Sequence, residues 1–272
     1  MSGLLVQLNR IGAIGRRDLR MELSYQFQLL LQVGNILITV TMFYFIGELV
    51  TGGPAMADVP GGYFEFVLLG LVVAGFAGAC LNALSENLRR AQNDDTLEIL
   101  LATSTPLGVL MFGALQVPLL LATFGAVVYL GLGMLVAAPV IHLGGVLPAI
   151  VLLVLLLGTF AAIGVLGASI IIIAKRGDPI SMLALQISTV LAGVYFAESV
   201  LPDALQVVSR LIPTFYGLRG IRAALLDGAA WSAVAGDGAI LVGFNLVLIP
   251  GSLWVLSRAI RRAKVSGTLG NR

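Results

Sequence analysis

The sequence contains six apolar segments that are each long enough to cross a lipid bilayer as a helix. They cover residues 29–50, 63–84, 107–137, 146–174, 181–199 and 238–257. A helix needs about 17 to 25 mostly apolar residues to cross the roughly 30 Å of hydrocarbon. Inside that layer the backbone polar groups must be bonded within the protein, which helices achieve. The chain is therefore predicted to be an all-α polytopic membrane protein, and residues 1–272 are expected to form a single transmembrane domain.

The composition agrees with a membrane protein and leaves little material for a soluble catalytic or receptor module. Of the 272 residues, 58% are hydrophobic and 11% are charged, whereas a typical soluble domain has about 25% charged residues. Cys80 is the only cysteine, which excludes a disulfide within the chain. The N-terminus lacks a continuous apolar core before a cleavage site, so we expect no removable signal peptide and insertion directed by the first span.

The basic residues predict the orientation. Thirteen of the sixteen Lys and Arg residues flank the spans on one side: Arg10, Arg16, Arg17, Arg20, Arg89, Arg90, Lys175, Arg176, Arg258, Arg261, Arg262, Lys264 and Arg272. The opposite loops, 51–62 and 138–145, contain none. Because cytoplasmic loops carry an excess of Lys and Arg, the basic side is predicted to be cytoplasmic. We therefore expect a multi-pass protein of the cell membrane (inner or plasma membrane) with both termini in the cytoplasm.

Residues 91–106, between the second and third spans, have the pattern of a short amphipathic helix in the cytoplasm. Groups that suit the positive end of a helix dipole gather in its first turn: Asp94, Asp95, Thr96 and Glu98. Leucines recur at helical spacing on one side: Leu97, Leu100 and Leu101. Such a helix on an aqueous loop is suited to contact with another protein.

The N-terminal residues 1–28 are predicted to form an interfacial helix. One stripe consists of Leu19, Leu23 and Phe27, and the other of Arg16, Arg17, Arg20 and Ser24. An apolar stripe opposite a basic one is typical of a helix that lies in the membrane interface. The alternative, that these arginines only fix the topology, explains the charge but not the apolar stripe.

Residues 200–228 on the outer side are too polar to span but have apolar residues at helical spacing. Two short helices broken at Pro213 fit the pattern, with Asp203 capping the first and Gly228 ending the second. Such a pair can enter the outer leaflet and return if protein covers its backbone. This re-entrant form is favoured slightly over a loop that lies flat on the membrane.

No group of residues indicates catalysis. His142 is the only histidine, and no cluster of His, Cys and carboxylate residues predicts a metal site or a nucleophile. A glycine-rich phosphate loop of the GxxxxGK[ST] type is also missing, so the chain is not expected to bind ATP itself. Apart from Glu48, Glu65 and Glu198 near the outer ends, the polar residues within the predicted spans are uncharged, which disfavours an ion-coupled carrier.

Two motifs in this topology give the chain its resemblance to the membrane subunits of type-2 ABC exporters. The first, on the cytoplasmic side, consists of Glu86, Arg89, Arg90, Thr96, Leu97, Glu98, Leu100, Leu101, Thr105 and Pro106. The second, in the outer segment, consists of Pro213, Phe215, Tyr216, Arg222, Leu225, Leu226 and Gly228. Asp95 stands where the family more often has glycine. The resemblance covers nearly the whole chain.

The resemblance implies a transport subunit, an ABC permease, that is not itself an enzyme. ATP and Mg²⁺ would bind to a separate cytoplasmic ABC ATPase, and no cofactor would bind to this chain. A second transmembrane subunit, identical or different, would complete an exporter, with no nucleic-acid partner. Contact with the ATPase is expected at the helix in 91–106 and at the flanking arginines: Asp94, Asp95, Thr96, Leu97, Glu98, Leu101, Arg16, Arg17 and Arg20.

The substrate class is predicted only broadly. Spans without charges favour a hydrophobic or amphiphilic compound over an ionic one. A different class of function also fits the sequence, namely a membrane scaffold or sensor that recruits a cytoplasmic protein through the same helix and moves no solute. A transport assay with both subunits in vesicles separates the two.

Overall fold

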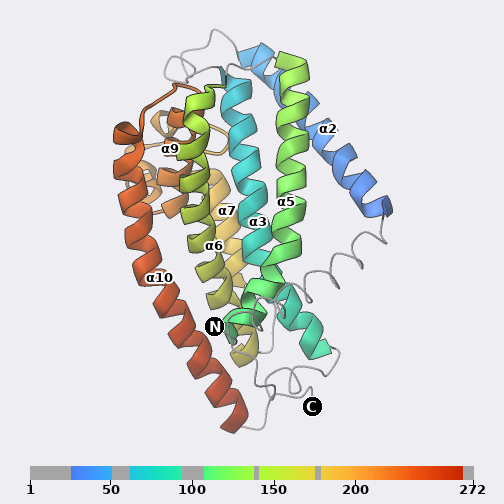
Figure 1. Cartoon of the computed structure of the whole chain (residues 1–272), viewed down its shortest axis with the longest axis vertical. Coiled ribbons are helices and arrows are strands. Elements are labelled where there is room, and N and C mark those ends of the chain that lie inside the picture. The colour runs from blue at the N-terminus through green and yellow to red at the C-terminus, as the bar shows by residue number, and fades with distance from the viewer. Residues whose placement is uncertain (1–25, 51–61, 94–106, 138–140, 175–178, 266–272) are drawn as a thin grey trace, which may run out of the picture.

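The computed structural model of the chain describes residues 26–50, 62–93, 107–137, 141–174 and 179–265, and all regular structure in these ranges is helical (Figure 1). The α-helices are α2 (Gln26–Val50), α3 (Tyr63–Asn93), α5 (Leu107–Ala137), α6 (Val146–Ala174), α7 (Pro179–Leu191), α8 (Asp203–Ser209), α9 (Pro213–Leu225) and α10 (Trp231–Val265). Two short 3-10 helices, η2 (Leu143–Gly145) and η3 (Glu198–Val200), lie in the connections.

Within the described ranges, five helices are long and apolar enough to cross a membrane. The spanning candidates lie in α2, α3, α5, α6 and α10, as Leu29–Val50, Tyr63–Asn87, Gly113–Ala137, Leu143–Ile172 and Trp231–Arg262. Across the molecule α10, α6, α3, α5 and α2 pack in this order (Figure 1). Large apolar side chains such as Leu37, Leu135 and Val247 are exposed on their outer sides. An apolar exterior of this extent fits a lipid environment.

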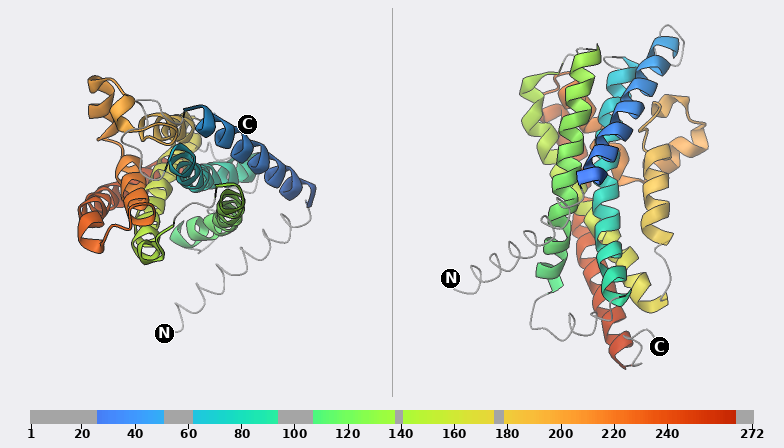
Figure 2. Two further views of the ribbon diagram at one scale, coloured as in Figure 1. Left: turned by 90° about the horizontal axis from the view of Figure 1, so that it is seen from above. Right: turned by 90° about the vertical axis from the view of Figure 1, so that its right-hand side faces the viewer.

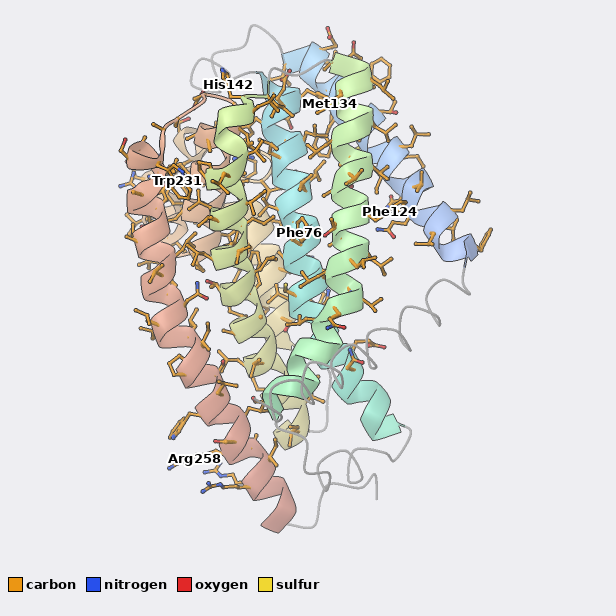
Figure 3. The ribbon with its side chains drawn as sticks, viewed as in Figure 1. Phe76, Phe124, Met134, His142, Trp231 and Arg258 are labelled. Atoms are coloured by element: carbon orange, nitrogen blue, oxygen red, sulfur yellow. The ribbon has the colours of Figure 1, made fainter. Side chains whose placement is uncertain are left out.

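The two ends of this bundle are named here by residues labelled in Figure 3. His142 lies at one end, near the start of α6, and Arg258 lies towards the other end, on α10. We call them the His142 end and the Arg258 end.

Helix α7 is shorter than the predicted fifth span. The apolar segment 181–199 was expected to cross the membrane, but the helix ends at Leu191. Its 13 residues extend only about 20 Å, which is less than the hydrocarbon thickness. Gly193 has a φ of +81°, a left-handed conformation that commonly follows the last residue of a helix and favours glycine.

Helices α8 and α9 follow this break and meet at Pro213, which is the first residue of α9. α8 begins at Asp203 itself, after Pro202. The expected capping role of Asp203 is therefore wrong, because this residue lies in the first helical turn. Beyond α9, Gly228 adopts a φ of +64°, which agrees with its predicted place after the helix. Figure 2 shows α7 and α8 along one side of the molecule.

The main core lies where α3, α6, α9 and α10 meet. Its buried members include Leu81, Leu156, Phe160, Leu218 and Leu241. A second buried cluster joins α6 to α10 nearer the Arg258 end. Helix α9 is thus part of the packed core, although it is too short to cross the membrane.

Glycine allows α3 and α6 to approach each other closely. A Cβ atom on Gly164 of α6 would lie 2.9 Å from the carbonyl oxygen of Cys80 and 3.2 Å from that of Leu81. Both neighbours are backbone atoms of a buried helix, so they cannot rotate out of the way. Small residues at helix crossings are common in membranes because packing must drive association there.

We expect Gly164→Ala to lower the free energy of unfolding by about 1–3 kcal/mol, because the new methyl group would push α3 and α6 apart. Thermal or denaturant unfolding in detergent measures this. Gly243→Ala is the matched control, since Gly243 of α10 has no atom within 4 Å of a Cβ. It should be neutral or slightly stabilising, as alanine is the better helix former. Equal stability of the two variants would contradict the close approach.

Candidate functional site

The predicted ATPase-contact residues lie outside the described residues. This applies to Asp94, Asp95, Thr96, Leu97, Glu98 and Leu101, and to Arg16, Arg17 and Arg20. The helix in 91–106 and the interfacial helix in 1–28 therefore stay predictions. The structure does describe the predicted outer segment, in which Pro213, Phe215 and Arg222 are buried and Tyr216 is half-buried.

Hydrogen bonds attach the start of α9 to the end of α7. The Ser209 hydroxyl donates to the carbonyl oxygen of Leu191 at 2.6 Å. The Thr214 hydroxyl lies 3.1 Å from that of Ser188, and the Tyr216 hydroxyl donates to the carbonyl oxygen of Arg210 at 2.8 Å. Ser209 and Thr214 thus fix the α8–α9 pair to α7, and Tyr216 joins α9 to the residue that follows α8.

Arg222 is the central polar residue of the site, and only 7% of it is exposed. Its Nη1 donates to the carbonyl oxygen of Gly193 at 2.8 Å. Its Nη2 donates to the carbonyl oxygens of Phe66 and Val194 at 2.7 and 3.2 Å. Its Nε donates to the same carbonyl oxygen of Phe66 at 3.1 Å. One side chain thereby joins α9 to α3 and to the break after α7.

No carboxylate of the described residues is bonded to Arg222. Carbonyl dipoles surround the guanidinium instead, and its Cζ lies 3.3 Å from the centroid of the Phe66 ring. Burial lowers the pKa of Arg222, which lies in α9 outside the spanning helices. Arginine keeps its charge in proteins, so the carbonyl groups and the aromatic ring have to offset the lost hydration.

Glycine makes room for this arrangement. A Cβ on Gly70 of α3 would lie 2.5 Å from the carbonyl oxygen of Val194 and 3.0 Å from Nη2 of Arg222. The break after α7 can therefore lie directly against α3 only because Gly70 has no side chain.

We expect Arg222→Met to lower the free energy of unfolding by about 1–3 kcal/mol, because the carbonyl groups of Gly193 and Val194 lose buried donors. Amide hydrogen exchange should also become faster in residues 192–197. Unfolding in detergent and exchange followed by mass spectrometry measure the two effects.

Arg210→Met is the matched control for this prediction. Arg210 is also an arginine of the outer segment, but 60% of its side chain is exposed and it pairs with Glu198. Exposed ion pairs contribute about 0–1 kcal/mol. If both variants changed stability and exchange equally, Arg222 would not hold the break in place.

Arg219 of α9, three residues before Arg222, pairs with Asp237 of α10. Its Nη2 and Nε donate to the two carboxylate oxygens, and the Nε to Oδ2 distance is 3.3 Å. The guanidinium also lies over the rings of Phe215 and Tyr216, with Cζ 5.1 and 5.4 Å from their centroids. The hydrogen bond to Asp237 raises the pKa of Arg219, so the guanidinium keeps its charge.

Asp237 is an acidic residue that the predicted last span left out. The last span was predicted to begin at residue 238, but α10 begins at Trp231 and its spanning candidate includes Asp237. Only 9% of the Asp237 side chain is exposed, against 54% for Arg219. Asp237 is the one acidic residue in the otherwise apolar stretch 229–257, and this isolation was the signal that could have identified it.

The unequal exposure of the two partners predicts unequal effects of their substitution. Arg219→Met would leave a buried carboxylate without its cation and should cost about 3 kcal/mol of unfolding free energy. Asp237→Asn should cost less than about 1 kcal/mol, because Arg219 reaches water and keeps a hydrogen-bond acceptor. The double variant should resemble Asp237→Asn alone. Unfolding of all three variants measures this, and additive costs would contradict the coupling.

No protein-family model and no curated protein matches the chain.

Within the described ranges, no group of three or more His, Cys, Asp or Glu side chains is placed to hold a metal ion. His142 is exposed, with its backbone N–H donating to the carbonyl oxygen of Leu225 at 2.9 Å, and Cys80 is buried in the core. Both positions fit structural roles.

Proposed function

We propose that this chain is the membrane-spanning subunit of an ATP-driven exporter. The single observation that supports this best is the pair of short helices α7 and α9, whose irregular junction is bonded by the buried Arg222. Irregular backbone at membrane depth occurs where protein buries it or where it lines a solute path. Arg222 and α9 lie in the outer segment 200–228, whose proline, aromatic pair and arginine carry part of the exporter resemblance.

We infer that α8 and α9 enter the outer half of the membrane and return. α9 lies against η2 and α6, from Gly145 of η2, where an added Cβ would meet Ala224, to Leu156 of α6, which faces Gly217. Leu156 is ten residues beyond the start of α6, or about 15 Å along its axis. This is about half of the roughly 30 Å hydrocarbon layer. On this proposal α7 enters from the other side, and 181–199 forms a broken fifth crossing.

The proposal places the Arg258 end of the bundle in the cytoplasm. The exposed Arg258, Arg261 and Arg262 lie at that end, as expected for a cytoplasmic side. A cytoplasmic ABC ATPase that binds ATP and Mg²⁺ would dock there on residues 91–106, the first three of which are the end of α3. A second transmembrane subunit, the same chain or another, would form the other half of the exporter in the cell membrane.

The charges seen in the structure fit a hydrophobic or amphiphilic substrate. Asp237 lies within α10, but Arg219 neutralises it. Arg222 is enclosed by backbone carbonyl groups. Neither group is free to exchange a coupling ion, which favours ATP over an ion gradient as the energy source.

The experiment is to reconstitute the chain in vesicles with an ATPase that co-purifies with it, and to follow ATP-dependent movement of a fluorescent amphiphile. We expect the double charge reversal Asp94→Arg with Glu98→Arg to reduce transport at least about tenfold while ATP hydrolysis continues. The reason is that ATP can move the membrane subunit only through contacts that differ between the two ATPase states.

Glu48→Arg is the control, because Glu48 is an exposed residue at the far end of α2 and should leave transport unchanged. Failure to capture any ATPase, or full transport by the double variant, would contradict the proposal. Capture of an ATPase without any movement of solute would instead favour the scaffold or sensor function.

A further inference from the structure

An exposed stripe on α10 changes from apolar to basic near the Arg258 end. Val247, Trp254, Arg258 and Arg261 are all exposed and lie on one face, at spacings of seven, four and three residues. The opposite face packs on α6 through Leu256, Ala259 and Ile260. Figure 3 shows Arg258 on the side of α10 that faces away from α6. The stripe therefore faces whatever surrounds the protein.

The chemistry of the stripe matches the boundary between lipid tails and headgroups. Val247 is 71% and Trp254 is 57% exposed, and exposed tryptophan is enriched where the hydrocarbon meets the headgroups. One turn further along, the Cζ of Arg258 lies 4.4 Å from the centroid of the Trp254 ring. The guanidinium of Arg258 thus stacks over the face of the Trp254 ring.

The arginines of the stripe differ in their ion-pair partners from Arg210 and Arg219 at the His142 end. Arg210 and Arg219 pair with Glu198 and Asp237, whereas no carboxylate of the described residues pairs with Arg258 or Arg261. Two guanidinium groups that are open to the surroundings call for an anion with several acceptor oxygens. Because the stripe continues from these arginines along α10 to the apolar Trp254 and Val247, that anion should carry an apolar tail.

We propose that Trp254, Arg258 and Arg261 form a binding site for an anionic phospholipid. The phosphate accepts hydrogen bonds from the two arginines, the glycerol region lies beside the Trp254 ring, and the acyl chains lie along Val247 and its exposed neighbours. A zwitterionic lipid fits less well because its own cation competes with the arginines. The site requires no transport activity, so it can be tested on the chain by itself.

The test uses Trp254 as the reporter. The chain has two tryptophans, so Trp231→Phe leaves only the one at the site. We would reconstitute this variant in phosphatidylcholine mixed with phosphatidylglycerol, with acyl-chain bromine on one lipid or the other, and measure fluorescence quenching. Brominated phosphatidylglycerol should quench Trp254 beyond random mixing, with a preference of up to about fivefold for each arginine that contacts the phosphate. High salt should reduce the preference.

The double substitution Arg258→Gln with Arg261→Gln, made in the Trp231→Phe variant, should bring the preference for phosphatidylglycerol over phosphatidylcholine close to one. Arg210→Gln is the matched control at the His142 end and should keep it. Brominated phosphatidylcholine should quench pure phosphatidylcholine samples of all variants equally, which verifies that each is folded and inserted. Equal quenching by the two brominated lipids, or a preference that survives the double substitution, overturns the proposal. A protein partner would then be the better candidate for the basic stripe.

Discussion

A helix that stops inside an apolar bundle leaves carbonyl groups without partners, and this fold depends on polar side chains that bond them. After α7 the Ser209 hydroxyl binds the carbonyl of Leu191, and Arg222 binds those of Gly193 and Val194. A guanidinium presents five donors in one plane, so it can join three segments at once. Lysine would bring the same charge but not this geometry. The buried cation is therefore best understood as the means by which the chain tolerates a broken helix at this depth.

The same region depends on the absence of side chains at a few positions. Gly70 lets the break lie against α3, and Gly217 and Gly220 let α9 lie against Leu156 and Leu152 of α6. A lipid environment offers no hydrophobic gain for helix association, so close packing and hydrogen bonds have to supply it. The glycines and Arg222 thus belong to one arrangement, in which small residues allow the approach and the arginine bonds the groups that the approach buries.

The sequence predicted the regular helices well and the local departures from them poorly. The apolar runs 107–137 and 146–174 have the same bounds as α5 and α6, because length and hydrophobicity alone decide such helices. The run 181–199 remains apolar beyond Leu191, so hydropathy could not reveal the turn at Gly193 that ends α7. Arg222 was named only through the family resemblance, since its burial depends on Phe66, which is 156 residues away in the chain. Asp237 was missed because the predicted span began at residue 238, seven residues after the first residue of α10, Trp231.

Helix α3 connects the two regions on which the proposed function depends. Near the His142 end it carries Phe66 and Gly70, which contact Arg222 and Val194. It ends at Asn93, directly before the residues that we expect to contact the ATPase. A 31-residue helix is about 45 Å long, and in its middle it is held against α6 at Gly164. If force from the ATPase enters at 94–98, a tilt of α3 about this close contact would move Phe66 and act directly on Arg222. The bonds of Arg222 would then join the junction of α7 and α9 to the ATPase side of the membrane, which gives the exporter proposal a physical route through the described residues.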